Sequence, residues 1–241
     1  MQSVIVTGDS RGLGTATVQA LLAETEYQII GISRSESENT EEFEEEYPDR
    51  YCHINFDLSN PEKISDLYQE ELKPRGPIYG LVNNAAMAYD DLVTNASVSP
   101  LEQMFRINVL SSIFLSKFSL RDMMLNRTEG ALVHVSSVST ATGYKGLSMY
   151  AATKGALEAF SLNTAREWGG RGIRSNCVVP GFMNTSMTDS LDEDVKDRIY
   201  NRTGLGEPTQ QASVAETIVF LLSGGASSIT GETIRVDSGT L

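Results

Sequence analysis

The chain of 241 residues is poor in the residues that build metal centres and disulfide frameworks, with two cysteines and two histidines. Cys52 and Cys177 lie in apolar, strand-like segments, which favours buried free thiols over a disulfide. His53 and His134 also fall in strand patterns, and no Cys and His residues have the spacing of a metal site. We therefore expect no bound metal ion.

Long apolar runs are also missing. No run reaches the length of about 20 residues that spans a membrane, so we expect no membrane segment. The first residues enter a predicted strand at once, which leaves no room for a signal peptide. Together with the free thiols, this predicts a cytoplasmic location.

Basic residues are scarce, with 19 Lys and Arg against 32 Asp and Glu and a net charge of -13. This balance argues against nucleic-acid binding, which needs a basic face. Much of the acidity comes from the run between Glu36 and Asp49. We interpret that run as a solvated helix face, and a docking surface for a basic partner is the less favoured alternative.

What the chain does have is an alternation of apolar strand-like runs and helical patterns. The predicted strands are Val4–Thr7, Gln28–Ile32, Cys52–Phe56, Ile78–Asn83, Ala131–Ser136, Arg174–Val179 and Thr233–Val236. The predicted helices are Thr15–Ala23, Glu41–Glu46, Pro61–Leu72, Leu101–Leu125, Ala151–Trp168 and Val214–Leu222. The alternation predicts an α/β fold, a doubly wound parallel sheet (Rossmann fold) of about seven strands with helices on both faces, in a single domain over residues 1–241.

A glycine-rich turn follows the first predicted strand. Gly8, Gly12 and Gly14 stand between Val4–Thr7 and the first helix. Glycines there let the backbone approach a phosphate group, and the helix N-terminus offers free N–H groups. The turn, with a strand before it and a helix after it, predicts a dinucleotide-binding site.

A tyrosine and a lysine lie four residues apart in the run Tyr150-Ala151-Ala152-Thr153-Lys154. That spacing puts both side chains on one helix face, where the ammonium would stabilise the phenolate and lower the pKa of the phenol. Such a phenol can exchange a proton with a carbonyl or alcohol oxygen. Ser137 stands thirteen residues upstream of Tyr150, just after a buried strand.

Several polar or glycine-rich segments come directly after predicted strands. They are Gly8–Gly14, Asp57, Asn83, Ser137 and Pro180-Gly181. Ligands of doubly wound sheets bind beyond the carboxyl ends of the strands. We therefore expect these segments to converge on one crevice.

With these motifs in this order, the chain resembles the short-chain dehydrogenase/reductase family over nearly its whole length. The matching positions are Thr7-Gly8-x-x-x-Gly12-x-Gly14, Asn83-Asn84-Ala85-Ala86, Asn108, Ser137, Tyr150, Lys154 and Pro180-Gly181 with Thr185. Two departures are Ala86 in place of a glycine and Val236-Asp237-Ser238-Gly239 in place of a terminal Asp-Gly-Gly. Neither departure touches the catalytic positions.

The resemblance implies hydride transfer from a nicotinamide cofactor to a carbonyl carbon. Tyr150 would donate a proton to the developing alkoxide, and Ser137 would hydrogen-bond the same oxygen. Lys154 would bind the nicotinamide ribose and lower the pKa of Tyr150. Asn108 would hold a water molecule on a proton path, or would be a structural asparagine that kinks its helix.

The resemblance also implies NADPH rather than NADH. NAD-using relatives carry an acid where Ser33 stands, whereas Arg34 and Arg11 match positions of NADP-using relatives. Asp57 matches the residue that meets the adenine. The predicted cofactor-binding set is Gly8, Ser10, Arg11, Gly12, Leu13, Gly14, Ser33, Arg34, Asp57, Leu58, Asn84, Ala85, Tyr150, Lys154, Pro180, Gly181 and Thr185.

Within the family, the chain is most similar to the 3-oxoacyl-(acyl carrier protein) reductases. Arg127 and Arg171 stand close to positions that grip the acidic carrier at the cleft mouth, and residues 182–208 match a substrate lid. The alternatives are the reduction of another ketone or diketone, or a non-catalytic NADP-binding regulator. The apolar helices Leu101–Leu125 and Ala151–Trp168 predict a homo-oligomer, a tetramer or a dimer.

Overall fold

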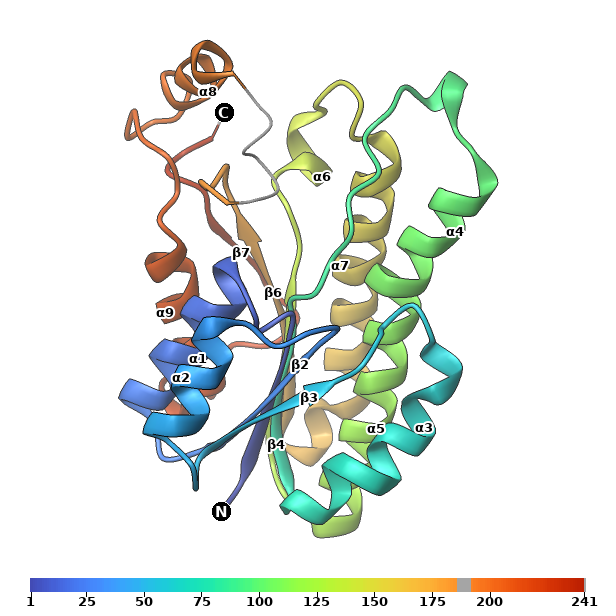
Figure 1. Ribbon diagram of the computed structural model, residues 1–241, viewed down its shortest axis with the longest axis vertical. Coiled ribbons are helices and arrows are strands. Elements are labelled where there is room, and N and C mark those ends of the chain that lie inside the picture. The colour runs from blue at the N-terminus through green and yellow to red at the C-terminus, as the bar shows by residue number, and fades with distance from the viewer. Residues whose placement is uncertain (186–191, 241) are drawn as a thin grey trace.

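The computed structural model describes residues 1–185 and 192–240 and confirms the predicted α/β fold (Figure 1). The described residues form one seven-stranded sheet in the order β3-β2-β1-β4-β5-β6-β7, and all neighbouring strands pair in parallel. The strands are β1 Ser3–Thr7, β2 Gln28–Ser33, β3 Tyr51–Asn55, β4 Ile78–Asn83, β5 Gly130–Val135, β6 Ile173–Pro180 and β7 Thr233–Val236. The carboxyl ends of all strands therefore lie along one edge, which we call the carboxyl edge.

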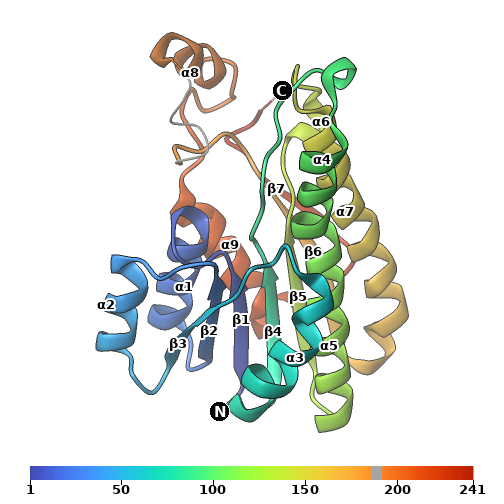
Figure 2. The same cartoon turned by 45° about the vertical axis from the view of Figure 1, so that its right-hand side comes forward.

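Helices cover both faces of the sheet (Figures 1 and 2). The α-helices are α1 Gly12–Glu24, α2 Glu38–Glu46, α3 Ile64–Leu67, α4 Val98–Phe105, α5 Ser111–Asn126, α6 Ser139–Thr142, α7 Ser148–Trp168, α8 Glu193–Tyr200 and α9 Gln211–Leu222. Helices α1, α2 and α9 lie on one face, and α3, α4, α5 and α7 lie on the other. Helix α8 stands beyond the carboxyl edge, in the segment predicted as a lid.

Strand β1 shows why the sheet needs two helical layers. Val4, Ile5 and Val6 are all completely buried. Val4 and Val6 pack into the core beneath α1 and α9, whereas Ile5 packs into the core beneath α3 and α5. Successive side chains of a strand point to opposite faces, so a run that is apolar at every position must be covered on both sides.

The predicted helix Leu101–Leu125 is not continuous, which corrects the prediction. A π-helical turn, Arg106–Leu110, separates α4 from α5. Asn108 lies in this turn, and its side chain is completely buried against the chain that follows β4. Apolar periodicity predicts a helix but does not report a one-residue bulge, and such bulges often mark functional sites.

The segment predicted as one helix over Pro61–Leu72 is also composite. It consists of a 3-10 turn Pro61–Lys63, the short α3, and a π-helical turn Tyr68–Leu72, and a 3-10 turn Lys73–Arg75 follows. The first helix begins at Gly12 rather than at Thr15. Its first turn therefore includes the last two glycines of the glycine-rich turn.

Candidate active site

The segments predicted to converge do lie together at the carboxyl edge of the sheet. The glycine-rich turn follows β1, Asn84 follows β4, Ser137 follows β5, and Gly181 follows β6. The Cβ position of Gly12 lies 4.0 Å from Cγ2 of Thr185, so the loop after β6 reaches over the start of α1. The loops after β1 and β6 therefore come close to each other at this edge.

The glycine-rich turn fits a phosphate group. Gly8 has a φ of 70°, in the left-handed region that favours glycine. A Cβ atom at Gly14 would lie 1.8 Å from the carbonyl oxygen of Gly8, so only a glycine lets the turn close onto α1. The first N–H groups of α1, from Gly12 onward, are free to donate hydrogen bonds to the pyrophosphate of a dinucleotide. The Leu13 side chain is buried in the core, so only its backbone is available to a ligand.

Thr7 ties this turn to the loop after β4. Its Oγ1 donates to the carbonyl oxygen of Val82 at 3.2 Å and accepts from the backbone N–H groups of Asn84 and Ala85, both at 3.0 Å. The Asn84 side chain donates back to the carbonyl oxygen of Thr7 at 2.9 Å. Thr7 is missing from the predicted site residues, although a hydroxyl at the end of a buried strand was a readable signal.

Asn108 joins three elements. Its Oδ1 accepts from the backbone N–H of Met87 at 2.8 Å, and its Nδ2 donates to the carbonyl oxygen of Met87 at 2.9 Å and to Oγ1 of Thr153 at 3.0 Å. Thr153 precedes Lys154 on α7. Asn108 therefore holds together the chain after β4 and the turn of α7 that carries Lys154. These contacts support a structural role for Asn108, the second of the two roles considered from the sequence.

Tyr150 and Lys154 share one face of α7, with the Lys154 Nζ 5.6 Å from the centre of the Tyr150 ring. The ammonium points to the carbonyl oxygen of Val135, to which it donates at 2.8 Å. Burial lowers the pKa of Lys154 to about 8. Burial, followed by the negative charge of Asp90, raises the pKa of Tyr150 above its ordinary value. The predicted lowering of the Tyr150 pKa is therefore wrong for this structure, because burial outweighs an ammonium that is engaged elsewhere.

Ser136 and Ser137 have different surroundings. Ser136 is buried, and its Oγ donates to Oε1 of Glu158 on α7 at 2.5 Å. Ser137 is partly exposed, and its Oγ accepts from the backbone N–H of Ser139 at 3.2 Å and contacts the Ser139 hydroxyl at 3.0 Å. Ser137 is thus the more accessible of the two serines, and its hydroxyl is not engaged by Glu158.

The predicted adenosine end carries exposed cations. Arg11 and Arg34 are both exposed, and no ion pair of either is found within the described residues. Asp57 accepts from the N–H and the hydroxyl of Ser59, both at 2.9 Å. The Ser59 N–H lowers the pKa of Asp57 most, and Arg34 adds to that lowering. Leu58, like Leu13, is buried in the core.

The predicted lid is described in part, since residues 186–191 lie outside the described residues. Gly181 packs closely at its base, where a Cβ atom would lie 2.3 Å from Oγ1 of Thr209. At the other end, Nε2 of Gln211 donates to the carbonyl oxygen of Asn184 at 2.7 Å. Gln211 is a further residue of this edge that the sequence did not indicate.

Arg127 and Arg171 do not lie at the cleft mouth of their own chain, which corrects that prediction. Arg127 caps the C-terminus of α5, three residues before β5 begins, and Arg171 lies two residues before β6 begins. The N–H of Gly130 donates to the carbonyl oxygen of Gly172 at 3.4 Å, so the two segments are neighbours. They lie at the amino ends of the strands, the edge opposite the catalytic residues.

The comparisons with known proteins agree with this geometry. A family model described as enoyl-(acyl carrier protein) reductase matches residues 8–240. The chain belongs to the short-chain dehydrogenase/reductase family. It is 33% identical over 235 residues to the 3-oxoacyl-[acyl-carrier-protein] reductase FabG of Vibrio cholerae, covering 98% of this chain and 95% of the relative. It is 32% identical over 237 residues to the corresponding protein of Aquifex aeolicus, with 98% and 95% covered.

Solved structures of the family superpose closely. A putative gluconate dehydrogenase from Agrobacterium tumefaciens has a TM-score of 0.92 at 22% identity, covering 99% of this chain and 95% of its own, which shows the fold alone. A putative NAD(P)-dependent gluconate 5-dehydrogenase from Beutenbergia cavernae with bound NADP has a TM-score of 0.91 at 25% identity, with 99% and 96% covered. The chain described here is therefore an oxidoreductase that uses a nicotinamide cofactor.

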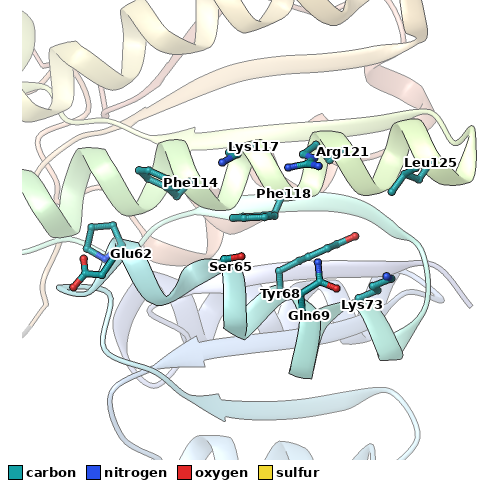
Figure 3. A pocket seen from close by; sticks show the side chains of 11 residues that line it. Glu62, Ser65, Tyr68, Gln69, Lys73, Phe114, Lys117, Phe118, Arg121 and Leu125 are labelled. Atoms are coloured by element: carbon teal, nitrogen blue, oxygen red, sulfur yellow. The ribbon is translucent and has the colours of Figure 1, made fainter.

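A hollow away from the carboxyl edge is not part of this site. A groove of about 260 Å³ lies between α5 and the segment that begins at Pro61, and Figure 3 shows the side chains that line it. Lys117 lies over the rings of Phe114 and Phe118, with its Nζ 5.4 and 5.0 Å from their centres. Lys73 and Arg121 also line the groove, and the described lining residues include none of the predicted site residues.

The described residues were also expected to hold no metal site and no membrane-spanning helix. No group of His, Cys, Asp and Glu side chains in the described ranges has the arrangement of a metal site. Within residues 1–185 and 192–240, no helix is both long and apolar enough to cross a membrane.

Proposed function

We propose that the protein is an NADPH-dependent reductase of 3-oxoacyl thioesters carried on an acyl carrier protein. The observation that carries the reaction class is the placement of Ser137, Tyr150 and Lys154 at the carboxyl edge beside a glycine turn that fits a phosphate. The substrate class rests on the identity to the reductases of Vibrio cholerae and Aquifex aeolicus. Two free thiols support a cytoplasmic location.

In this proposal the bound nicotinamide supplies a hydride to the carbonyl carbon. Tyr150 donates its proton to the carbonyl oxygen, and its raised pKa keeps that proton available at neutral pH. Ser137 fixes the same oxygen by a hydrogen bond. Lys154 binds the nicotinamide ribose and adds positive charge beside the phenol, and Asn108 holds the turn of α7 that carries the lysine.

Selectivity for NADPH would come from Arg34, which directly follows β2 where Ser33 stands instead of an acid, and from Arg11 in the glycine-rich turn. Arg34→Asp should weaken NADPH binding by about tenfold to a hundredfold and favour NADH, because a charge-assisted contact to the 2′-phosphate contributes roughly 1.5–3 kcal/mol. Fluorescence titration of both cofactors measures this. A wild-type protein that binds NADH more tightly than NADPH would contradict the assignment.

Carrier docking requires a second subunit, because Arg127 and Arg171 lie at the edge opposite the catalytic residues. Helix α5 starts next to Asn108 and ends at Arg127, so it runs from one edge of the sheet to the other. A two-fold axis across α5 and α7 pairs these helices antiparallel. Arg127 of the partner subunit would then lie beside the catalytic edge.

A mixed-subunit experiment tests this arrangement. Charge reversal by Arg127→Glu with Arg171→Glu should raise the KM for a 3-oxoacyl carrier substrate and spare acetoacetyl coenzyme A, and the matching glutamine pair should have a smaller effect. Mixing the charge-reversed protein with the Tyr150→Phe protein should restore carrier activity. In the mixed dimer, the charge-reversed subunit provides an intact catalytic site. The Tyr150→Phe subunit provides the unaltered arginines that this site faces.

The alternative is a reductase of a free small ketone or diketone, with both arginines as solvated surface charges. It predicts equal kinetics on the carrier substrate before and after charge reversal, and no recovery on mixing. A screen of NADPH oxidation against acetoacetyl thioesters, diketones and cyclic ketones separates the two functions directly. A complete absence of turnover on any carbonyl, with tight NADPH binding, would favour a non-catalytic regulator.

A further inference from the structure

The glycine-rich turn contains an acid whose side chain points into the protein. Asp9 is completely buried, and its Oδ2 accepts from the Tyr51 hydroxyl at 2.6 Å. The same oxygen lies 2.7 Å from Nδ1 of His53, and Nδ1 must be the donor because a carboxylate oxygen only accepts. The turn that binds the cofactor is thereby tied to β3, the strand at the edge of the sheet.

Gly31 on β2 makes room for this carboxylate. A Cβ atom at Gly31 would lie 1.8 Å from Oδ2 of Asp9 and 2.8 Å from the Tyr51 hydroxyl. Gly31 pairs with His53 in the register of β2 and β3. The four residues Asp9, Gly31, Tyr51 and His53 therefore form one complementary set, which we call the Asp9 network.

The Asp9 network and the turn cannot move independently. Asp9 directly follows Gly8, and its backbone carbonyl oxygen accepts from Oγ1 of Thr15 in the first turn of α1 at 2.7 Å. One residue thus anchors the turn to β3 through its side chain and to α1 through its backbone. A change in the side-chain contacts of Asp9 shifts the N–H groups that face a phosphate.

The proton on His53 balances a buried negative charge. Burial of the imidazole favours a lower pKa, but the hydrogen bond and charge of Asp9 outweigh burial, so the pKa of His53 is raised above its ordinary value. The other acids facing His53 are Glu36 in the loop after β2 and Glu44 on α2, whose Oε1 accepts the His53 backbone N–H at 2.7 Å. These charges all favour the protonated imidazole.

His53 also has a hydrogen-bonded path to the surface. Its Nε2 lies 3.3 Å from Oδ1 of Asn55, and the Asn55 amide donates to Oε1 of Glu36 at 3.1 Å. Asn55 and Glu36 are exposed, and the loop of Glu36 begins with Arg34. Oδ1 of Asp9 has no hydrogen-bond partner among the described residues, so the imidazolium provides the main charge compensation of this carboxylate.

We propose that the Asp9–His53 pair is a proton-linked positioning element of the cofactor turn, which holds the turn in place and weakens NADPH binding when His53 loses its proton. This inference rests on the proposed use of NADPH. With the proton, the pair has no net charge. Without it, the pair leaves an uncompensated carboxylate directly beneath the turn that must accept phosphate groups, and like charges repel.

The experiment uses the fact that the chain has only two histidines. His134 is buried with its pKa lowered to about 3, whereas the pKa of His53 is raised above its ordinary value, so a titration through and above neutral pH follows His53. Imidazole NMR of the full chain gives the pKa of His53 with and without saturating NADPH. Dissociation constants for NADPH and NADH are measured over the same range for wild type, His53→Gln, Asp9→Asn and, as a matched control, the exposed Glu45→Gln on α2.

We expect NADPH to raise the pKa of His53, and the NADPH affinity of the wild type to fall by about threefold or more as His53 deprotonates. His53→Gln should remove this decrease and leave only the titration of the 2′-phosphate, near pH 6. Glu45→Gln should behave as wild type, and NADH, with less phosphate charge, should show a smaller effect.

Two results would overturn the linkage. One is an unchanged pKa of His53 on NADPH saturation, and the other is the same pH dependence of NADPH affinity in wild type and His53→Gln. If Asp9→Asn fails to fold, these two measurements remain decisive because neither uses that variant. A protein that binds NADH but not NADPH would instead overturn the cofactor assignment, and the linkage with it.

Discussion

At the scale of single residues, the catalytic proposal rests most heavily on one hydroxyl. Tyr150→Phe removes it and preserves the ring, so the fold and cofactor binding should survive. Turnover should fall by about a hundredfold or more, the usual contribution of a positioned acid. Steady-state NADPH oxidation measures turnover, and cofactor titration is the control. Near-normal turnover with cofactor binding intact would remove Tyr150 from the mechanism.

Lys154 is a buried lysine that reduces stability. The unfolded chain holds this proton up to about pH 10.5 and the folded chain only to about pH 8. Between these values the unfolded state binds more protons, so stability rises with pH there. We expect Lys154→Met to raise Tm at pH 7 while abolishing turnover, and the difference in Tm should shrink as pH rises above about 8. The exposed Lys117→Met is the matched control, without this pH dependence.

At the scale of elements, the junction of β1 and α1 allows no side chain at Gly14. A Cβ atom there would lie 1.8 Å from the carbonyl oxygen of Gly8, so Gly14→Ala should open the turn. We expect loss of measurable cofactor affinity by titration, with a folded far-ultraviolet circular dichroism spectrum. Gly170→Ala, which meets no atom within 4 Å, should bind cofactor normally. Unchanged affinity in Gly14→Ala would show that the turn relaxes easily.

The Asn108 side chain ties the π-helical turn between α4 and α5 to Met87 and to α7. Asn108→Ala removes its bonds to both backbone groups of Met87 and to Thr153. We expect a loss of about 1–3 kcal/mol in the free energy of unfolding, because buried partners are left unsatisfied. Denaturant unfolding measures this, with the exposed Asn163→Ala on α7 as control. A loss of turnover without a loss of stability would favour the water-holding role instead.

The sequence predicted those elements whose signal is local. The strand that contains Val4, Ile5 and Val6 and the glycines of the first turn were readable because burial and backbone freedom impose residue types directly. The sequence left an irregular helix at Asn108 as only one of two alternatives, since the bulge depends on a backbone partner twenty-one residues away in the chain. The direction of the Tyr150 pKa was predicted wrongly for the same reason, because burial is a property of the packed structure.

At the scale of the whole molecule, several large apolar side chains on the outer helices are exposed. Leu110 just before α5, Met124 and Leu125 near its C-terminus and Leu162 on α7 are between 38% and 75% exposed. Such side chains favour association of subunits. We expect a homodimer or homotetramer by light scattering. Leu125→Glu with Leu162→Glu should lower the mass to that of a monomer, whereas Val93→Glu, on a separate exposed loop, should not. A monomeric wild type at micromolar concentration would contradict the prediction.

The close fit of Asp9 against Gly31 has a consequence for how this protein can change over generations. A side chain at position 31 requires a smaller residue at position 9. A smaller residue at position 9 leaves the hydrogen-bond donors of Tyr51 and His53 without an acceptor. Substitutions at the four positions are therefore non-additive, and each tolerated change depends on those made before it. Mutations near the end of β2 that aim to change the cofactor preference are subject to the same non-additivity. Mutant libraries should therefore vary the four positions jointly rather than one at a time.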